Sequence, residues 1–170
     1  MTVVSVDRDF DELTLVLVAE FDAPVERVWQ LWADPRQLER WWGPPSHPST
    51  VVEHELAPGG SVTYFMTGPG GETSRGWWRV TAVHAPTSLE FTDGFADASG
   101  APDPALPTTE ARVRLAERDG VTRMELRFRF DSAKRMKQLE EWGAFEVFPQ
   151  SVAQMDEVLA TAQDTTQEAG

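Results

Sequence analysis

Hydrophobic and polar residues alternate with a period of two over most of the chain after residue 51, the pattern of strands with one buried face. Glycine, proline and aspartate separate the alternating runs, as at 58–60, 68–71 and 118–120. An earlier run rich in β-branched and apolar residues predicts one further strand. The pattern therefore predicts about seven strands, at residues 13–21, 51–56, 60–67, 73–83, 88–95, 109–117 and 121–130.

The last two of these strands form the clearest hairpin, because an Asp-Gly pair at 119–120 separates their arms. Each arm places apolar side chains on one face and charged side chains on the other, which is the face exposed to solvent. The side chains expected on the apolar face are Ala111, Val113, Leu115, Met124, Leu126, Phe128 and Phe130.

Two short helices are predicted between the first and second of the seven strands. Val25, Val28, Trp29 and Trp32 recur at helical spacing within residues 22–35, and a second helix over 36–42 ends in two tryptophans. The Gly-Pro-Pro run at 43–45 stops that helix. The adjacent rings of the two tryptophans either seal the core together, or one seals the core while the other faces a cavity mouth.

The segment from residue 131 to 159 predicts a long C-terminal helix with an apolar stripe. Pro149 interrupts the stripe and predicts a kink or break. Gly143 predicts a bend or close approach, with Trp142 packed beneath the sheet. Antiparallel hairpins followed by a helix predict an α+β layer fold. The stripe consists of Phe145, Phe148, Val152, Met155 and Leu159.

The absence of cysteine and the negative net charge exclude or disfavour several classes of function. The 170 residues include no cysteine, which excludes a disulfide framework and thiolate metal sites. Lysine and arginine number 15 against 28 aspartates and glutamates, a net charge of −13 that disfavours nucleic acid and anionic membranes. No run is apolar enough to span a bilayer and the N-terminus does not resemble a signal peptide, so we expect a cytoplasmic protein. A neutral ligand or a basic protein partner fits the charge, and either a monomer or a homodimer is compatible with it.

The chain resembles the START-like (SRPBCC) superfamily with the birch-pollen-allergen fold, and within it the branch named after the activator of heat-shock-protein-90 ATPase. The resemblance rests on FDAPVERVWQLWADPRQLERWWGPP, LAPGGSVTYFMTGPGG, FTDGFADASGAPDPALPTT, DGVTRMELRFRF and LEEWGAFEVFPQSVAQMDEVL. It implies a helix-grip fold, a curved antiparallel sheet around a long C-terminal helix with a cavity between them. We expect one domain over residues 1–160 and a polar tail over 161–170.

Candidate site residues follow from strand alternation inside such a cavity. His54, Tyr64 and Asp93 are its expected polar groups. Alternatively, each of them has a local hydrogen-bond partner in a filled core. No metal or cofactor is expected, because His54 points away from Glu53 and Glu55 on a strand. The expected apolar wall consists of Trp42, Trp78, Met124, Leu126, Phe128, Phe145, Phe148, Val152 and Met155.

Three functional hypotheses follow, and the first is favoured. The protein binds a small, largely apolar ligand without catalysis. As an alternative, the resemblance implies an interaction role: a regulatory, toxin–antitoxin or stress-response partner of a small helix-turn-helix protein, or activation of a chaperone ATPase. As a second alternative, it implies a cyclase or hydrolase in which His54 works with Tyr64 or Asp93 as acid and base. The sequence does not identify the ligand.

Overall fold

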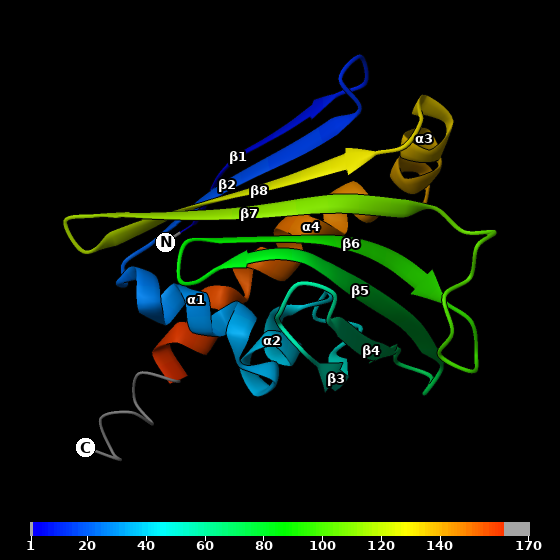
Figure 1. The fold of residues 1–170 in the computed structure, drawn as a ribbon, viewed down its shortest axis with the longest axis horizontal. Coiled ribbons are helices and arrows are strands. Elements are labelled where there is room, and N and C mark those ends of the chain that lie inside the picture. The colour runs from blue at the N-terminus through cyan, green and yellow to red at the C-terminus, as the bar shows by residue number, and fades with distance from the viewer. Residues whose placement is uncertain (1, 162–170) are drawn as a thin grey trace.

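One curved antiparallel sheet organises the part of the chain that the computed structural model describes, residues 2–161 (Figure 1). Its strand order is β1-β2-β8-β7-β6-β5-β4-β3. The α+β helix-grip fold is confirmed. The strands are β1 (Thr2–Asp9), β2 (Thr14–Phe21), β3 (Ser49–His54), β4 (Ser61–Thr67), β5 (Thr73–His84), β6 (Ser88–Ala96), β7 (Thr108–Arg118) and β8 (Val121–Phe130), and the helices are α1 (Val25–Ala33), α2 (Pro35–Trp41), α3 (Ala133–Glu141) and α4 (Ala144–Ala153).

The sheet has one strand more than the seven that alternation predicted. β1 forms a hairpin with β2 and is the edge of the sheet opposite β3. The connecting turn is held by the Asp9 carboxylate, which accepts hydrogen bonds from the backbone N–H groups of Asp11 and Glu12. The domain boundaries stay a prediction, and the tail expected at 161–170 lies outside the described residues except for Thr161.

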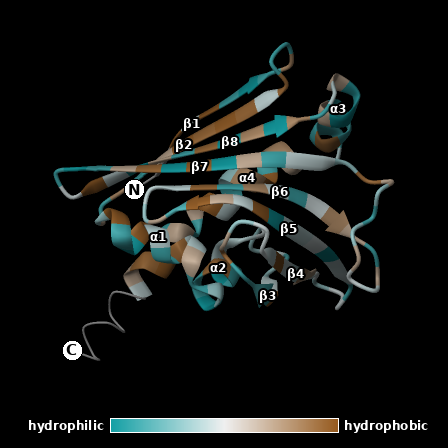
Figure 2. Cartoon of the chain, viewed as in Figure 1, coloured by the Kyte–Doolittle hydropathy of each residue, from teal (hydrophilic) through white to brown (hydrophobic). Residues whose placement is uncertain are grey.

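The predicted hairpin of β7 and β8 is confirmed, with β7 one residue longer at each end than predicted. Asp119 and Gly120 both have positive φ angles, 53° and 79°, as the tight turn between twisted strands requires. The predicted apolar residues of both arms are buried. Figure 2 shows hydrophilic and hydrophobic residues alternating along these strands. Within residues 2–161, no helix is both long enough and apolar enough to cross a membrane.

The C-terminal helical region runs in consecutive pieces. Gly143, at a φ of 84°, separates α3 from α4 and confirms the predicted bend. Pro149 lies inside α4 without breaking it, so the break expected there is wrong; the interruption comes at Gln154, after which residues 155–161 are helical again. Trp142 is 51% exposed, so its expected place beneath the sheet is also wrong. As the C-cap of α3 it lies at the corner that the left-handed glycine creates.

Replacing Gly143 with alanine should lower the free energy of unfolding by about 1–2 kcal/mol, because a left-handed φ strains any residue with a Cβ atom. No atom lies within 4 Å of an added Cβ, so the loss comes from the backbone alone. Urea denaturation measures it. Gly143→Asn is the matched control and should lose less, since asparagine tolerates this conformation. An alanine variant as stable as the wild type would contradict the assignment of this bend.

An aromatic cluster joins α1 and α2 to the sheet. Trp32 lies at its centre, fully buried, with its ring centroid 4.6 Å from that of Trp41 and 6.0 Å from that of Trp78. Trp78 in turn stacks on Phe91 with a centroid distance of 3.9 Å. This cluster fills the region between the two short helices and β5 and β6, and the space that remains open lies beside it.

Candidate functional site

A cavity of about 250 Å³ lies between the inner face of the sheet and the C-terminal helices. Its walls come from β4, β6, β7 and β8 on one side, and from the end of α2, from α3 and from α4 on the other. The lining is mostly apolar and aromatic. It consists of Trp41, Trp42, Gly43, Tyr64, Met66, Asp93, Gly94, Phe95, Pro107, Thr109, Leu126, Leu139, Trp142, Ala144, Val147, Phe148, Ser151 and Val152.

Six of the twelve residues predicted to line a cavity do so: Trp42, Tyr64, Asp93, Leu126, Phe148 and Val152. Five others face inward but are buried in core that is already filled. Phe128, for example, is fully buried, stacks against Phe148 at 4.2 Å between ring centroids and does not line the cavity. The five core residues are Trp78, Met124, Phe128, Phe145 and Met155.

His54, the twelfth, is not part of the cavity lining. Its Nε2 atom lies 3.0 Å from the backbone carbonyl oxygen of Trp32, and its side chain is half-buried. Strict alternation would place Val52 on the same inward face as His54, but the register shifts between Val51 and Glu53 and leaves Val52 59% exposed. His54 is therefore a structural contact between β3 and α1, and the structure does not bring it together with Tyr64 and Asp93.

Tyr64 and Asp93 form the polar pair of the cavity. The Tyr64 hydroxyl donates a hydrogen bond to Asp93 Oδ1 at 3.1 Å. The residue opposite Tyr64 on β5 is Gly76, where an added Cβ atom would lie 2.3 Å from the Tyr64 hydroxyl oxygen. Gly76 therefore provides the space that the tyrosine ring occupies, which explains a glycine at a buried position inside β5.

Burial dominates the electrostatics of this pair. It raises the pKa of the Asp93 carboxyl from 3.8 to about 7, although hydrogen bonds from Tyr64 and from the backbone of Gly94 act in the opposite direction. Burial, and then the charge of Asp93, raise the pKa of Tyr64 well above its ordinary value. At neutral pH the tyrosine is thus a hydrogen-bond donor, and the carboxyl exchanges between its neutral and charged forms.

The tryptophan pair at 41–42 forms one end of the cavity, and both rings are buried. The indole N–H of Trp41 donates to the backbone carbonyl of Leu31 at 2.8 Å. Gln154 donates its side-chain N–H group to the carbonyl oxygen of Gly43 at 2.6 Å and to that of Trp41 at 3.3 Å. The glutamine thus ties the C-terminal helical region to the turn after α2.

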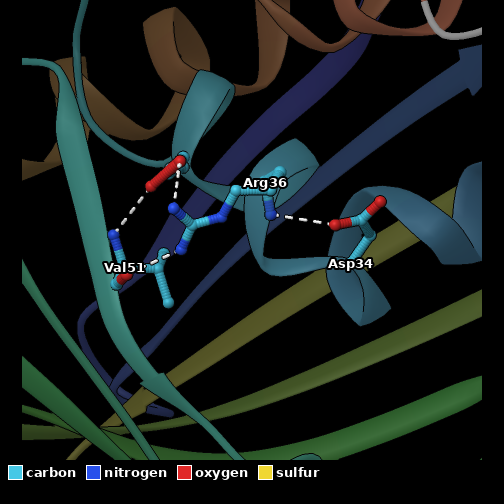
Figure 3. A network of polar contacts seen from close by, with 4 residues as sticks. Asp34, Arg36 and Val51 are labelled. Carbon is cyan, nitrogen blue, oxygen red and sulfur yellow. Dashed lines mark hydrogen bonds and ion pairs between the residues drawn. The ribbon is translucent and has the colours of Figure 1, made fainter.

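Side chains of α2 fix that helix on the edge strand β3 (Figure 3). Arg36 Nη2 donates to the Val51 carbonyl oxygen at 2.8 Å, and the Glu39 carboxylate accepts from the Val51 N–H at 3.0 Å. Arg36 and Glu39 also form an ion pair of 3.2 Å, and Asp34 caps the helix by accepting from the Arg36 N–H. These contacts satisfy backbone groups of an otherwise open sheet edge and hold the tryptophan pair in place.

Several lining residues were not predicted from the sequence pattern. Met66 and Phe95 could have been found, since each lies two positions along its strand from Tyr64 or Asp93 and shares its face. Trp142 and Pro107 lie outside the strands, where alternation gives no signal. Within residues 2–161, the structure has no group of three or more histidine, cysteine, aspartate or glutamate side chains arranged to hold a metal ion.

The chain is similar to one protein family and to several solved structures. A family model described as Activator of Hsp90 ATPase homolog 1-like protein matches residues 22–160. The solution structure of a protein from Arthrobacter aurescens is 49% identical, with a TM-score of 0.91, over 94% of this chain and 93% of that one. A crystal structure from Mycobacterium smegmatis is also 49% identical, with a TM-score of 0.84, over 92% and 96% of the two chains. An AHSA1 protein from Silicibacter pomeroyi, 23% identical over 88% and 99%, shares the fold at a TM-score of 0.68. No curated protein matches.

Proposed function

We propose that this chain, which belongs to the family of Activator of Hsp90 ATPase homolog 1-like proteins, binds a small, largely apolar molecule in the cavity between sheet and helices without transforming it. At the level of the family, the fold supports small-ligand binding or a regulatory role. We go further than the family and assign the binding to this cavity and to small, largely apolar molecules.

The observation that carries the proposal is the composition of the cavity wall. Most of its side chains are apolar or aromatic, and its polar groups, Tyr64 and Asp93 among them, are few. Small-molecule sites have this character, with an apolar lining that supplies affinity and a few polar groups that fix orientation. A cavity of roughly 150 Å³ can hold benzene, so about 250 Å³ suits a molecule somewhat larger than one aromatic ring.

The other hypotheses stay predictions. Pairing with a basic helix-turn-helix protein, or activation of a chaperone ATPase, rests on the net charge of −13 and on the family resemblance. The enzyme hypothesis used His54 as an acid or base beside Tyr64 or Asp93. His54 instead contacts a backbone carbonyl and is not among the cavity-lining residues, so it cannot act there. Tyr64 and Asp93 retain the capacity for proton transfer, but we assign them to recognition.

Filling the cavity should weaken the binding of a neutral apolar probe. Leu126 lines the cavity floor from β8 and is 1% exposed, so the larger ring in Leu126→Phe must occupy cavity space. We expect ethylbenzene to shift the indole N–H signals of the three lining tryptophans in the NMR spectrum of the wild type. The variant should bind it at least about tenfold more weakly, equivalent to roughly 1.4 kcal/mol.

Leu17→Phe is the matched control. Leu17 faces Leu126 directly across β2 and β8, and it is fully buried without lining the cavity. Overpacking should cost either variant about 1–3 kcal/mol of stability, while only Leu126→Phe should lose the probe. Equal binding by the wild type and Leu126→Phe would place the probe outside the cavity, and a wild type that binds no probe would contradict the proposed function.

A further inference from the structure

Asp93 is the one charged side chain that lines the cavity within residues 2–161. No lysine, arginine or histidine shares this lining, and none of the ion pairs among the described residues includes Asp93. Its contacts are the Tyr64 hydroxyl at Oδ1 and the backbone of Gly94. A carboxylate offers about four acceptor positions, so part of its capacity is free. An acid without a basic partner in an apolar cavity calls for an explanation beyond packing.

Six aromatic side chains line the same cavity: Trp41, Trp42, Tyr64, Phe95, Trp142 and Phe148. Trp42 lies edge-on to Tyr64 with a centroid distance of 6.0 Å, and Trp142 lies edge-on to Phe95 at 5.9 Å. The faces of aromatic rings attract cations, and sets of such rings are a common means of binding organic ammonium groups. Aromatic walls and a lone carboxylate are therefore complementary to the same kind of ligand.

We propose, as a refinement that rests on the proposed function, that the ligand of this cavity is a protonated organic amine, with its ammonium group on Asp93 and its apolar body among the aromatic side chains. The net charge of −13 favours the approach of a cation over that of an anion. An anionic head group is disfavoured, because it would face the Asp93 carboxylate with no basic side chain among the described lining residues to offset it.

The groups around Asp93 are consistent with this assignment. Tyr64 faces it from β4, Trp78 pairs with it from β5 and Thr109 pairs with it from β7, while α4 contributes Ser151 to the same cavity lining. Of these only Tyr64 titrates, and burial holds its pKa well above neutrality. Burial also raises the pKa of Asp93 to about 7, against the opposing effect of its hydrogen bonds with Tyr64 and Gly94. A bound ammonium group would lower that pKa, so the amine binds the charged form of the cavity.

Three probes of one shape test the proposal: 2-phenylethylamine, 2-phenylethanol and 3-phenylpropanoate. Calorimetry at pH 8 should show the protonated amine binding the wild type at least about tenfold more tightly than the alcohol, with the carboxylate weakest. Asp93→Asn keeps the shape of the side chain and an acceptor for Tyr64 but removes the charge, so it should bind the amine no more tightly than the alcohol. Tyr64→Phe keeps the charge and should keep the preference.

Affinity of the wild type for the amine should also fall by up to about tenfold for each pH unit below about 7, while affinity for the alcohol stays nearly constant. An alcohol that binds the wild type as tightly as the amine, or a preference that persists in Asp93→Asn, would overturn the proposal and leave apolar binding intact. If none of the probes, ethylbenzene included, binds the wild type, the proposed function fails as well.

Discussion

Replacing Trp32 with alanine should lower the free energy of unfolding by about 3–5 kcal/mol. The side chain is fully buried, and its ring contacts four other aromatic rings. Removing it leaves a void that these large rings cannot close, so the loss includes both the transfer of apolar surface and the cavity. Urea denaturation, followed by far-ultraviolet circular dichroism, measures the change. The dependence of the unfolding free energy on urea concentration should stay the same in both proteins. The four neighbouring rings are Trp41, Trp42, Trp78 and Phe91.

Trp142→Ala is the matched control for this experiment, since it removes the same ring from a position that is 51% exposed. The edge-on pair with Phe95 is its aromatic contact among the described residues, and such a pair contributes roughly 0.5–1.5 kcal/mol. The control should therefore lose about 1 kcal/mol. Similar losses for the two variants would mean that the cluster around Trp32 is not the centre of the core.

The fold was predictable where one physical rule determined each position. In β7 and β8 every second side chain faces the core, and the Asp-Gly turn fixes the register, so alternation alone identifies the buried face. The helix ending at Trp41 was equally clear, because Gly43-Pro44-Pro45 cannot continue it. β1 was missed because its eight residues include three that are charged, Asp7, Arg8 and Asp9, and so lack the apolar alternation used to find strands.

Two local irregularities of the backbone, a bulge in β3 and the left-handed Gly143, explain why His54 and Trp142 do not lie where they were predicted. A bulge in β3 adds one residue to the strand, so the alternation that places His54 inward wrongly places Val52 on the same face. His54 faces α1 as a result of the bulge and not because it shares a face with Val52. Trp142 has an apolar side chain, but the left-handed Gly143 after it turns the chain, and no periodic pattern records a turn of one residue.

The sequence predicted that a cavity exists and which side chains face inward, but not which of those side chains border open space. Alternation identified which side chains face inward, and Phe128 and Leu126 both do. Whether an inward side chain meets protein or open space depends on how far α4 stands from the sheet. Phe148 packs on Phe128 and closes the space there, whereas Leu126 remains on the cavity floor. That separation is a property of tertiary packing, which the order of residues along one strand does not encode.

Asp93→Asn should stabilise the ligand-free protein at pH 8 by up to roughly 4 kcal/mol and leave its stability unchanged near pH 4. The reason is the raised pKa of Asp93, about 7 in the folded chain against an ordinary value of 3.8. Burial disfavours the charged carboxylate, and the described residues of the cavity lining include no basic partner that would offset this cost. Asparagine has the same shape and can still accept the hydrogen bond from the Tyr64 hydroxyl, but it is never charged.

The sign of the pH dependence follows from the two protonation equilibria. Below about pH 4 the carboxyl is protonated in both the folded and the unfolded chain, so it adds no pH dependence. As the pH rises from there towards 7, the unfolded chain releases the proton and the folded chain keeps it, and the folded state loses stability. Above about pH 7 both states are charged, and the folded protein bears the full cost of the buried carboxylate.

The measurement is the difference in unfolding free energy between Asp93→Asn and the wild type, taken by urea denaturation at intervals from about pH 4 to pH 8. Other titrating groups contribute almost equally to both proteins, so the difference isolates Asp93. It should grow with pH until about pH 7 and then level off. Glu110→Gln on β7 is the control, because it removes an exposed carboxylate and should give a small, flat difference. A flat difference for Asp93→Asn as well would show that the cavity does not penalise the charge, and it would remove the energetic reason for a cationic ligand.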